Sequence, residues 1–244
     1  MIGPVTVARY KDLCMDAADA LAQARFWGAA LGAKLVDLGD GDARLDPGPG
    51  RPANEVIWIN AVPEPRTGKT RVHLDLRLAA ADPSPLLDAG ATVLREPGGD
   101  PWWVLADPEG NAFCAFPPRA DGSTGPGVYE LNVDCADPDA QAAWWAAMVG
   151  GTISHADGTA AIADAAGFPW QYWVFGAVPE PKTVKNRVHW DVQLAGPDPA
   201  AFVEAGAAVQ REPGGDVDWW VLTDPEGNEF CAFPAREDEA RTGQ

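Results

Sequence analysis

The sequence predicts an α+β fold built from two tandem copies of one domain. Long segments recur at an offset of 116 or 117 residues, and each copy reads twice as a strand, a helix and three strands. Polar and apolar residues alternate along the most regular strands. Self-similarity at so long a period indicates duplicated domains, because solenoid repeats are much shorter.

The repeat is clearest in the second half of each copy. Val62–Asp75 recurs as Val178–Asp191, and Trp102–Pro117 recurs as Trp219–Pro234. Glycine, proline and small polar residues gather between the copies, which is typical of a linker. We therefore expect a first domain over residues 1–118, a linker over 119–127, a second domain over 128–235 and a polar tail over 236–244.

Helix signals occur at equivalent places in the two copies. Asp137 and Pro138 supply an N-cap and a proline at the first helical position, and Gly150 ends this helix. The first copy has its counterpart over 19–31, and shorter helices are expected over 85–90 and 199–206. Each helix is expected to cover one face of a sheet.

Composition and charge exclude several functions. With 18 basic and 36 acidic residues the net charge is −18, which disfavours nucleic acids and anionic membranes as partners. No apolar run is long enough to span a membrane, and the four cysteines form no CxxC pair. We expect a cytoplasmic protein with a small-molecule ligand and reduced thiols.

Alternation places a polar row on one strand of each copy. One face carries Arg71, His73, Asp75 and Arg77 in the first copy, and Arg187, His189, Asp191 and Gln193 in the second. The apolar residues between them must pack on a helix. The polar row is therefore expected to point into the concave side of the sheet.

These motifs resemble the glyoxalase-like vicinal-oxygen-chelate (VOC) superfamily. The resemblance rests on the paired βαβββ order, an FWxxxLG-like helix, the N-R-V-H-W-D strand and the closing D-P-E-G-N-E-F-C, and it covers nearly the whole chain. It implies two VOC domains, each of two βαβββ modules with curved mixed sheets enclosing a pocket. It also implies a monomer that acts as an intramolecular pseudo-dimer, with a homodimer as the alternative.

The resemblance further implies a metal-binding histidine at the positions of His73 and His189. The first strand offers Asp12 and Glu130, and the last strand has Cys114 and Cys231 where metal-dependent members commonly have an acid. The resulting alternative zinc or other divalent-metal sets are Asp12, His73 and Cys114 in one copy and Glu130, His189 and Cys231 in the other. Neither is the two-histidine set of iron oxygenases, so an iron extradiol dioxygenase is disfavoured.

Because these positions depart from the metal-dependent pattern, we expect no metal cofactor. The leading hypothesis is a small-molecule binding protein of the bleomycin-resistance or sequestration type, with a hydrophobic or aromatic ligand. A lyase or isomerase that uses Glu130, His189 and Asp191 for acid–base chemistry is the alternative, so an enzymatic role stays open. The expected ligand contacts are Asp12, Arg71, His73, Asp75, Trp102, Cys114, Trp173, Arg187, Trp219 and Cys231.

Overall fold

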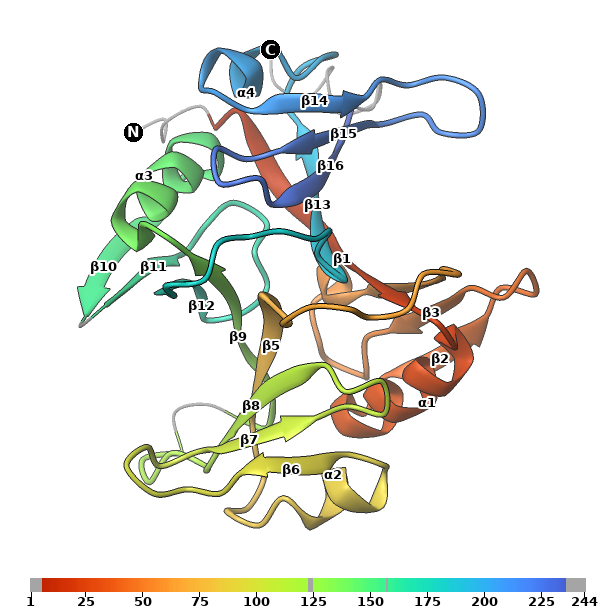
Figure 1. Ribbon diagram of the computed structural model, residues 1–244, viewed down its shortest axis with the longest axis vertical. Helices are drawn as coiled ribbons and strands as arrows, with labels where there is room; N and C mark the ends of the chain where they lie inside the picture. The colour runs from red at the N-terminus through yellow and green to blue at the C-terminus, as the bar shows by residue number, and fades with distance from the viewer. Residues whose placement is uncertain (1–5, 123–124, 157, 236–244) are drawn as a thin grey trace.

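Each repeat folds into two βαβββ modules, in the order that its sequence signals predict (Figure 1). The computed structural model describes residues 6–122, 125–156 and 158–235. The predicted tail, 236–244, lies outside the described residues, as do residues 123 and 124 of the predicted linker.

The first repeat contains modules 1 and 2. Module 1 consists of β1 (Ala8–Ala17), α1 (Ala20–Leu31), β2 (Lys34–Asp37), β3 (Ala43–Asp46), the short η1 (Ala53–Glu55) and β4 (Ile57–Ala61). Module 2 consists of β5 (Val72–Arg77), α2 (Ser84–Asp88), β6 (Thr92–Arg95), β7 (Trp103–Ala106) and β8 (Ala112–Phe116).

The second repeat contains modules 3 and 4. Module 3 consists of β9 (Gly127–Cys135), α3 (Pro138–Val149), β10 (Thr152–Ala156), β11 (Thr159–Ala163) and β12 (Tyr172–Ala177). Module 4 consists of β13 (Val188–Leu194), α4 (Ala200–Glu204), β14 (Ala208–Arg211), β15 (Trp220–Thr223) and β16 (Glu229–Phe233).

The two long helices begin and end where the local sequence predicts. The Asp19 side chain accepts a hydrogen bond from the Ala22 amide at 2.9 Å, and Asp137 accepts one from Ala140 at 3.0 Å. Gly150 follows α3 with φ 72°, a left-handed value that favours glycine. The N-cap prediction is confirmed in both repeats.

The strands form two eight-stranded mixed sheets, and each sheet combines both repeats. Sheet A has the order β14-β15-β16-β13-β1-β4-β3-β2, and sheet B has the order β10-β11-β12-β9-β5-β8-β7-β6. Module 1 therefore shares a sheet with module 4, and module 2 shares one with module 3. In Figure 1 the red and blue strands accordingly lie together, as do the yellow and green ones. The tandem α+β organisation is confirmed, while the module pairing is a feature that the repeat pattern does not reveal.

Antiparallel pairs of strands join the modules at the centre of each sheet. In sheet A, Asp12 on β1 lies opposite Asp191 on β13. In sheet B, Glu130 on β9 lies opposite Asp75 on β5. Beside each pair the register shifts by one residue, and Lys11 and Tyr129 are the extra residues. Such β-bulges change the direction of neighbouring side chains and are common beside functional sites.

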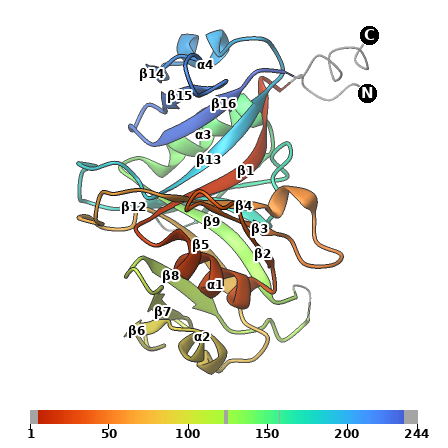
Figure 2. The same cartoon turned by 90° about the vertical axis from the view of Figure 1, so that its right-hand side faces the viewer.

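The hydrophobic core lies on the convex faces of the sheets, where α1 and α3 pack (Figure 2). Trp145 of α3 contacts Trp173 of sheet B and Trp190 of sheet A, with ring centroids 4.8 and 5.1 Å apart. All three side chains are fully buried. This confirms that the apolar row containing Trp190 belongs to the core, and it leaves the concave faces to the polar rows.

The D-P-E-G-N turns hold the two modules of each repeat together. Asp107 accepts a hydrogen bond from Gln23 of α1 at 2.9 Å, and Asp224 accepts one from Gln141 of α3 at 2.7 Å. Glu226 accepts from the backbone amide of Asp137 at the start of α3, at 2.8 Å. The motif that carries the family resemblance therefore has a structural role at these contacts.

Replacing Trp145 with alanine tests the link between the two sheets through the core. We expect Trp145→Ala to lower the free energy of unfolding by about 3–5 kcal/mol, because a cavity replaces a fully buried ring. Urea unfolding followed by circular dichroism measures this change. Leu94, of which 57% is exposed, is the control: Leu94→Ala should change stability by less than about 0.5 kcal/mol. Equal effects of the two substitutions would contradict this account of the core.

Candidate ligand-binding sites

Site A lies on the concave face of sheet A, around the carboxyl groups of Asp12 and Asp191. Both side chains are buried, and the two carboxyl groups are in hydrogen-bond contact. The indole N–H of Trp58 donates to Asp12 Oδ2 at 3.1 Å. The Oδ1 atoms of Asp12 and Asp191 are buried without a hydrogen-bond partner of their own among the described residues.

Lys11 brings a positive charge into this group. Its Nζ atom lies 2.5 Å from Asp12 Oδ2 and 4.0 Å from Asp191 Oδ2. The same ammonium lies 4.1 Å from the centroid of the Phe233 ring, which stacks on Trp219 at 5.1 Å. The bulge in β1 makes this possible, because it directs two successive residues, Lys11 and Asp12, to the same face.

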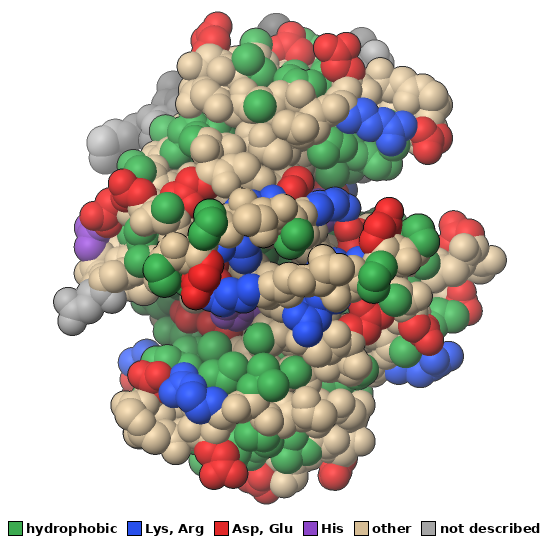
Figure 3. Space-filling model, in the orientation of Figure 1, with side chains coloured by type: hydrophobic (Ala, Val, Ile, Leu, Met, Phe, Trp, Pro, Cys, Tyr) green, Lys and Arg blue, Asp and Glu red, His purple; other side chains and the backbone are tan. Residues whose placement is uncertain are grey.

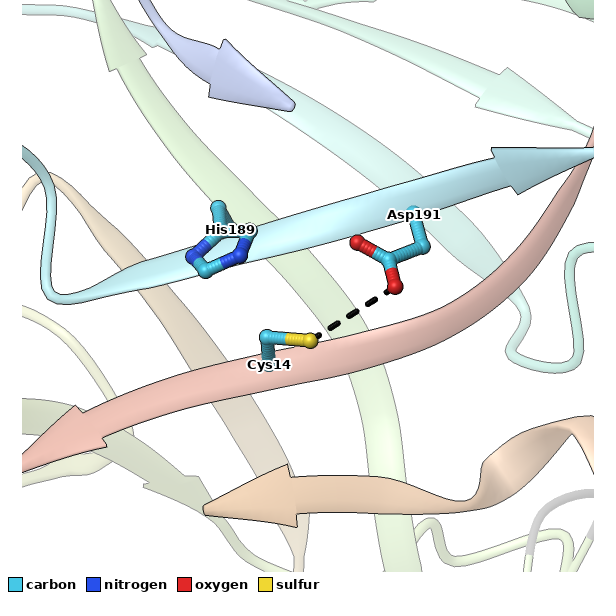
Figure 4. A group of neighbouring side chains, drawn as sticks. All are labelled: Cys14, His189 and Asp191. Atoms are coloured by element: carbon cyan, nitrogen blue, oxygen red, sulfur yellow. Dashed lines mark hydrogen bonds between the residues drawn. The ribbon is translucent and has the colours of Figure 1, made fainter. Parts of the chain in front are cut away.

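Burial keeps the remaining groups of site A neutral. It is the main cause that raises the pKa of Asp191 well above its usual value, and the charge of Asp12 adds to it. Burial also lowers the pKa of His189 and raises the pKa of the Cys14 thiol. Cys14 and Asp191 point towards each other in Figure 4, with Sγ 3.7 Å from Oδ2.

Site B repeats this arrangement on the concave face of sheet B, around Asp75 and Glu130. The two carboxyl groups are in hydrogen-bond contact, and the Cys114 amide donates to Asp75 Oδ1 at 2.9 Å. Burial raises the pKa of Glu130 to about 7 and that of Asp75 well above its usual value. His73 Nε2 lies 3.4 Å from Asp75 Oδ1, and burial lowers the pKa of this imidazole to about 4.

The aromatic and cationic groups of site B come from different strands. Trp102 stacks on Phe116 at 4.9 Å, as Trp219 stacks on Phe233 in site A. Arg77 of β5 supplies the cation and lies 4.0 Å from the Tyr129 ring centroid and 5.3 Å from that of Phe116. Its guanidinium donates to the Pro117 carbonyl at 3.0 Å. The described residues include no ion pair between Arg77 and Asp75 or Glu130.

The donors in the two sites differ in how well they suit the divalent metal that the fold family implies. Cys14, His189 and Asp191 in site A, and His73, Asp75 and Cys114 in site B, each offer ligand atoms within 4.8 Å of one another. Imidazole, carboxylate and thiolate are donors that zinc prefers. In site A the Lys11 ammonium already contacts the carboxylates and would repel a second cation, so a metal does not fit there. In site B the donors fit zinc.

The predicted ligand sets combined residues that belong to different sites. Asp12 was grouped with His73 and Cys114, but it lies opposite Asp191 in sheet A. Glu130 was grouped with His189 and Cys231 as a metal set, and with His189 and Asp191 for acid–base chemistry, but it lies opposite Asp75 in sheet B. These groupings are wrong, because the first strand of each repeat pairs with the polar-row strand of the other repeat.

Of the predicted aromatic contacts, Trp102 and Trp219 lie on the concave faces and Trp173 does not. Trp173 is fully buried and stacks on Phe168 at 5.3 Å, so its assignment to the ligand pocket is wrong.

Cys231 lies beside Asp191, its neighbour in the register of β16 and β13. Burial raises the pKa of the Cys231 and Cys114 thiols, which keeps both uncharged.

Arg71 and Arg187 hold the two repeats together. Arg71 donates to the carbonyls of Glu180 and Asp134 at 2.8 and 3.1 Å. Arg187 donates to the carbonyl of Glu64 at 2.9 Å. Each arginine thus contacts the loop or strand of the opposite repeat. The Nε atom of each arginine is buried without a hydrogen-bond partner among the described residues.

Sequence reasoning missed the residues that the bulges and the strand pairing bring into the sites. In site A these are Lys11, Cys14 and Trp58, and in site B it is Tyr129. Arg77 continues the polar row of β5, so the alternation pointed to it. No sequence signal marks the bulges at Lys11 and Tyr129.

A groove on the surface reaches Lys11 of site A. The groove has a volume of about 420 Å³ and is lined by Lys11, Asn54 and Gln193 among others. Figure 3 shows the surface hollowed on the right, between the part formed by β14 and β15 and the part formed by β2 and β3.

Among the described residues, no helix is both long and apolar enough to cross a membrane.

Comparisons with solved structures agree with this fold. Glyoxalase I from Zea mays superposes with a TM-score of 0.62 at 16% identity, covering 93% of this chain and 92% of that one. A variant of the same maize enzyme gives a TM-score of 0.65 at 16% identity, with coverage of 93% and 92%. A putative dioxygenase from Bacillus subtilis gives 0.61 at 15% identity, with coverage of 93% and 85%. At these identities the likeness establishes the fold alone.

The sequence itself matches a family model twice. A search of the curated proteins finds no match. The model of the glyoxalase-like domain matches residues 12–116 and 130–233, one match in each repeat. The matches cover most of the chain, and the chain therefore belongs to the glyoxalase-like domain family, with two tandem domains of the VOC type.

Proposed function

We propose that this protein binds a planar, hydrophobic small molecule on its concave faces, as a ligand-sequestering protein of the glyoxalase fold. The observation that carries the proposal is that both sites repeat a stacked Trp–Phe pair, a cation over the Phe ring and a buried carboxyl pair. Packing of a duplicated hydrophobic core does not explain this repeated arrangement, because Trp102 and Trp219 lie partly exposed on the concave faces.

The aromatic pair supplies the binding surface. In site A, Trp219 keeps part of its surface exposed beside Phe233, so a flat ring can stack along this pair. Such stacking is worth about 0.5–1.5 kcal/mol per ring pair beyond the burial of apolar area. The Lys11 ammonium lies over Phe233, at the end of this aromatic surface that adjoins the carboxyl pair.

The carboxyl pair supplies orientation. A protonated carboxyl group donates a hydrogen bond and its ionised neighbour accepts one, so a ligand with adjacent acceptor and donor groups pairs with Asp12 and Asp191. The Lys11 ammonium neutralises the negative charge of the ionised carboxyl group in the buried site. None of these contacts requires a metal ion in site A.

A second candidate function is a lyase or isomerase reaction at site B. The observation that favours it is the contact between Asp75 and Glu130 beside His73, because two interacting buried carboxyl groups suit proton transfer near neutral pH. A bound zinc ion would supply Lewis-acid chemistry at the same donors. Site B, and not the originally expected set of Glu130, His189 and Asp191, is then the place for such chemistry.

Ligand binding is tested by a thermal-shift screen of planar aromatic compounds, followed by calorimetry on each hit. We expect Trp219→Ala to weaken binding at site A about tenfold, because the ring that carries the stacking is lost. Trp102→Ala should have the same effect at site B. A compound that is converted to product would support the second candidate function.

The matched controls replace each tryptophan with phenylalanine, which keeps an aromatic ring in the stack but makes it smaller. Trp219→Phe and Trp102→Phe should retain most of the affinity, since a phenyl ring can still stack on Phe233 or Phe116. Loss of binding only in the alanine variants supports the proposal. If every compound binds the alanine variants as tightly as the wild type, the proposed binding surface is wrong.

The raised pKa of Asp191 predicts a pH dependence of stability. Burial raises the pKa of Asp191, so the folded chain holds the proton of this carboxyl group more tightly than the unfolded chain. From about pH 4, the ordinary pKa of aspartate, up to the raised value, stability therefore falls as pH rises. We expect Asp191→Asn to remove this loss, so that its stability relative to the wild type increases with pH.

Urea unfolding of the wild type and the variant at several pH values measures this difference. The exposed Asp218 is the control, since Asp218→Asn should leave the pH profile of the wild type unchanged. A stability difference between Asp191→Asn and the wild type that stays constant from pH 4 upwards would show that Asp191 is ionised in the folded protein.

A further inference from the structure

The bulge residue is the main chemical difference between the two sites. In both sheets one extra residue precedes the carboxylate of the first strand: Lys11 before Asp12, and Tyr129 before Glu130. Both side chains reach the concave face, where Lys11 contacts Phe233 and Tyr129 contacts Phe116. Equivalent backbone positions therefore present an ammonium in site A and a phenol in site B.

We propose that Lys11 is a built-in cation that takes the place of a divalent metal ion in site A, and that site B, where Tyr129 occupies this position, takes the metal. The inference goes beyond ligand binding and is independent of the organic molecule that the sites hold. It assigns Lys11 as the residue that decides which site admits a metal.

The spacing of the donors does not distinguish the sites. One histidine, one aspartate and one cysteine offer ligand atoms within 4.8 Å of one another in each site. Figure 4 shows the set in site A, with the Cys14 sulfur directed at Asp191. The ammonium makes the difference, because its Nζ atom lies 2.5 Å from Asp12 and 4.0 Å from Asp191. A metal ion at these carboxylates would have to displace it or lie beside it.

Among the described residues, neither cation near site B forms an ion pair with Asp75 or Glu130, although the charge of Arg77 opposes the burial that raises the pKa of Glu130. Arg95, the second cation, lies over Trp102 and pairs with Asp100 at 2.8 Å. Arg77 lies over the ring of Tyr129 at 4.0 Å and donates to the Pro117 carbonyl, which fixes its guanidinium at the aromatic end of the site. His73 Nδ1 is buried without a hydrogen-bond partner among the described residues, as is His189 Nδ1 in site A, so the imidazoles do not distinguish the sites. A carboxylate pair, an imidazole and the Cys114 thiol are thus left for a cation to bind.

The test measures zinc bound by the full-length chain after loading with Zn²⁺ and removal of the excess. We expect one zinc per wild-type chain, two per Lys11→Gln chain and one per Lys11→Arg chain, which keeps the charge. The reciprocal change, Tyr129→Lys, should leave no zinc on the chain. Elemental analysis gives these ratios without any assay of activity.

Cobalt reports which cysteine binds the metal, because thiolate ligation gives Co²⁺ an intense charge-transfer absorption. Cys114→Ser should abolish this absorption in the wild-type background. Adding Lys11→Gln to Cys114→Ser should restore it through the thiols of site A. Absorption that persists in Cys114→Ser alone would place the wild-type metal elsewhere and overturn the proposal.

Folding of each variant is checked by circular dichroism and melting temperature, and Lys11→Met replaces Lys11→Gln if the latter does not fold. A folded Lys11 variant that holds no more zinc than the wild type overturns the proposal, as does a wild-type chain that holds two. The zinc ratios do not involve an aromatic ligand. A failure here therefore leaves the proposed binding function standing, and failure of the ligand screen leaves this assignment standing.

Discussion

Two antiparallel strand pairs, β1 with β13 and β5 with β9, fix the chemistry of this molecule. Each pair joins the first strand of one repeat to the polar-row strand of the other, and the register places Asp12 opposite Asp191 and Glu130 opposite Asp75. Neither repeat contains a complete site by itself. The arginines that reach across to the opposite repeat, Arg71 and Arg187, stabilise the same junction.

Burying two carboxyl groups against each other is unfavourable, and the fold compensates for it on the other face of the same strands. Each polar residue of β13 is adjacent to an apolar one, so His189 and Asp191 flank the fully buried Trp190. Trp190 packs against Trp145 and Trp173, which connects the two sheets through one core. The strand that carries His189 and Asp191 of site A is therefore held by a fully buried aromatic cluster, which limits rearrangement when a ligand binds.

Local sequence signals predicted the elements, and the strand pairing lay beyond them. Asp137, Pro138 and Gly150 mark the ends of α3 because capping depends on neighbouring residues. The alternation of side chains along a strand also depends only on neighbouring residues, and it correctly placed His189 and Trp190 on opposite faces. Which strands pair depends on contacts between residues far apart in the chain, and a duplicated sequence offers two equivalent partners for each strand. Pairing within a repeat therefore gave the wrong site groupings, although every strand was expected in the correct order.

The same limit applies within the sites, where the duplicated halves have diverged. Each site keeps one cation over a phenylalanine ring, but Lys11 comes from β1 and Arg77 from β5. The position equivalent to Arg77 is Gln193, whose amide donates to the Phe233 carbonyl at 3.1 Å. Both sites therefore have a cation, but their electrostatics differ: Lys11 forms an ion pair with Asp12, whereas the described residues show no such pair between Arg77 and Asp75 or Glu130. A unit charge at about 4 Å acts on another with about 4 kcal/mol at an effective dielectric constant of about 20, and on a divalent ion with about twice that. One residue in a bulge is thus enough to give two copies of one fold different affinities for a cation.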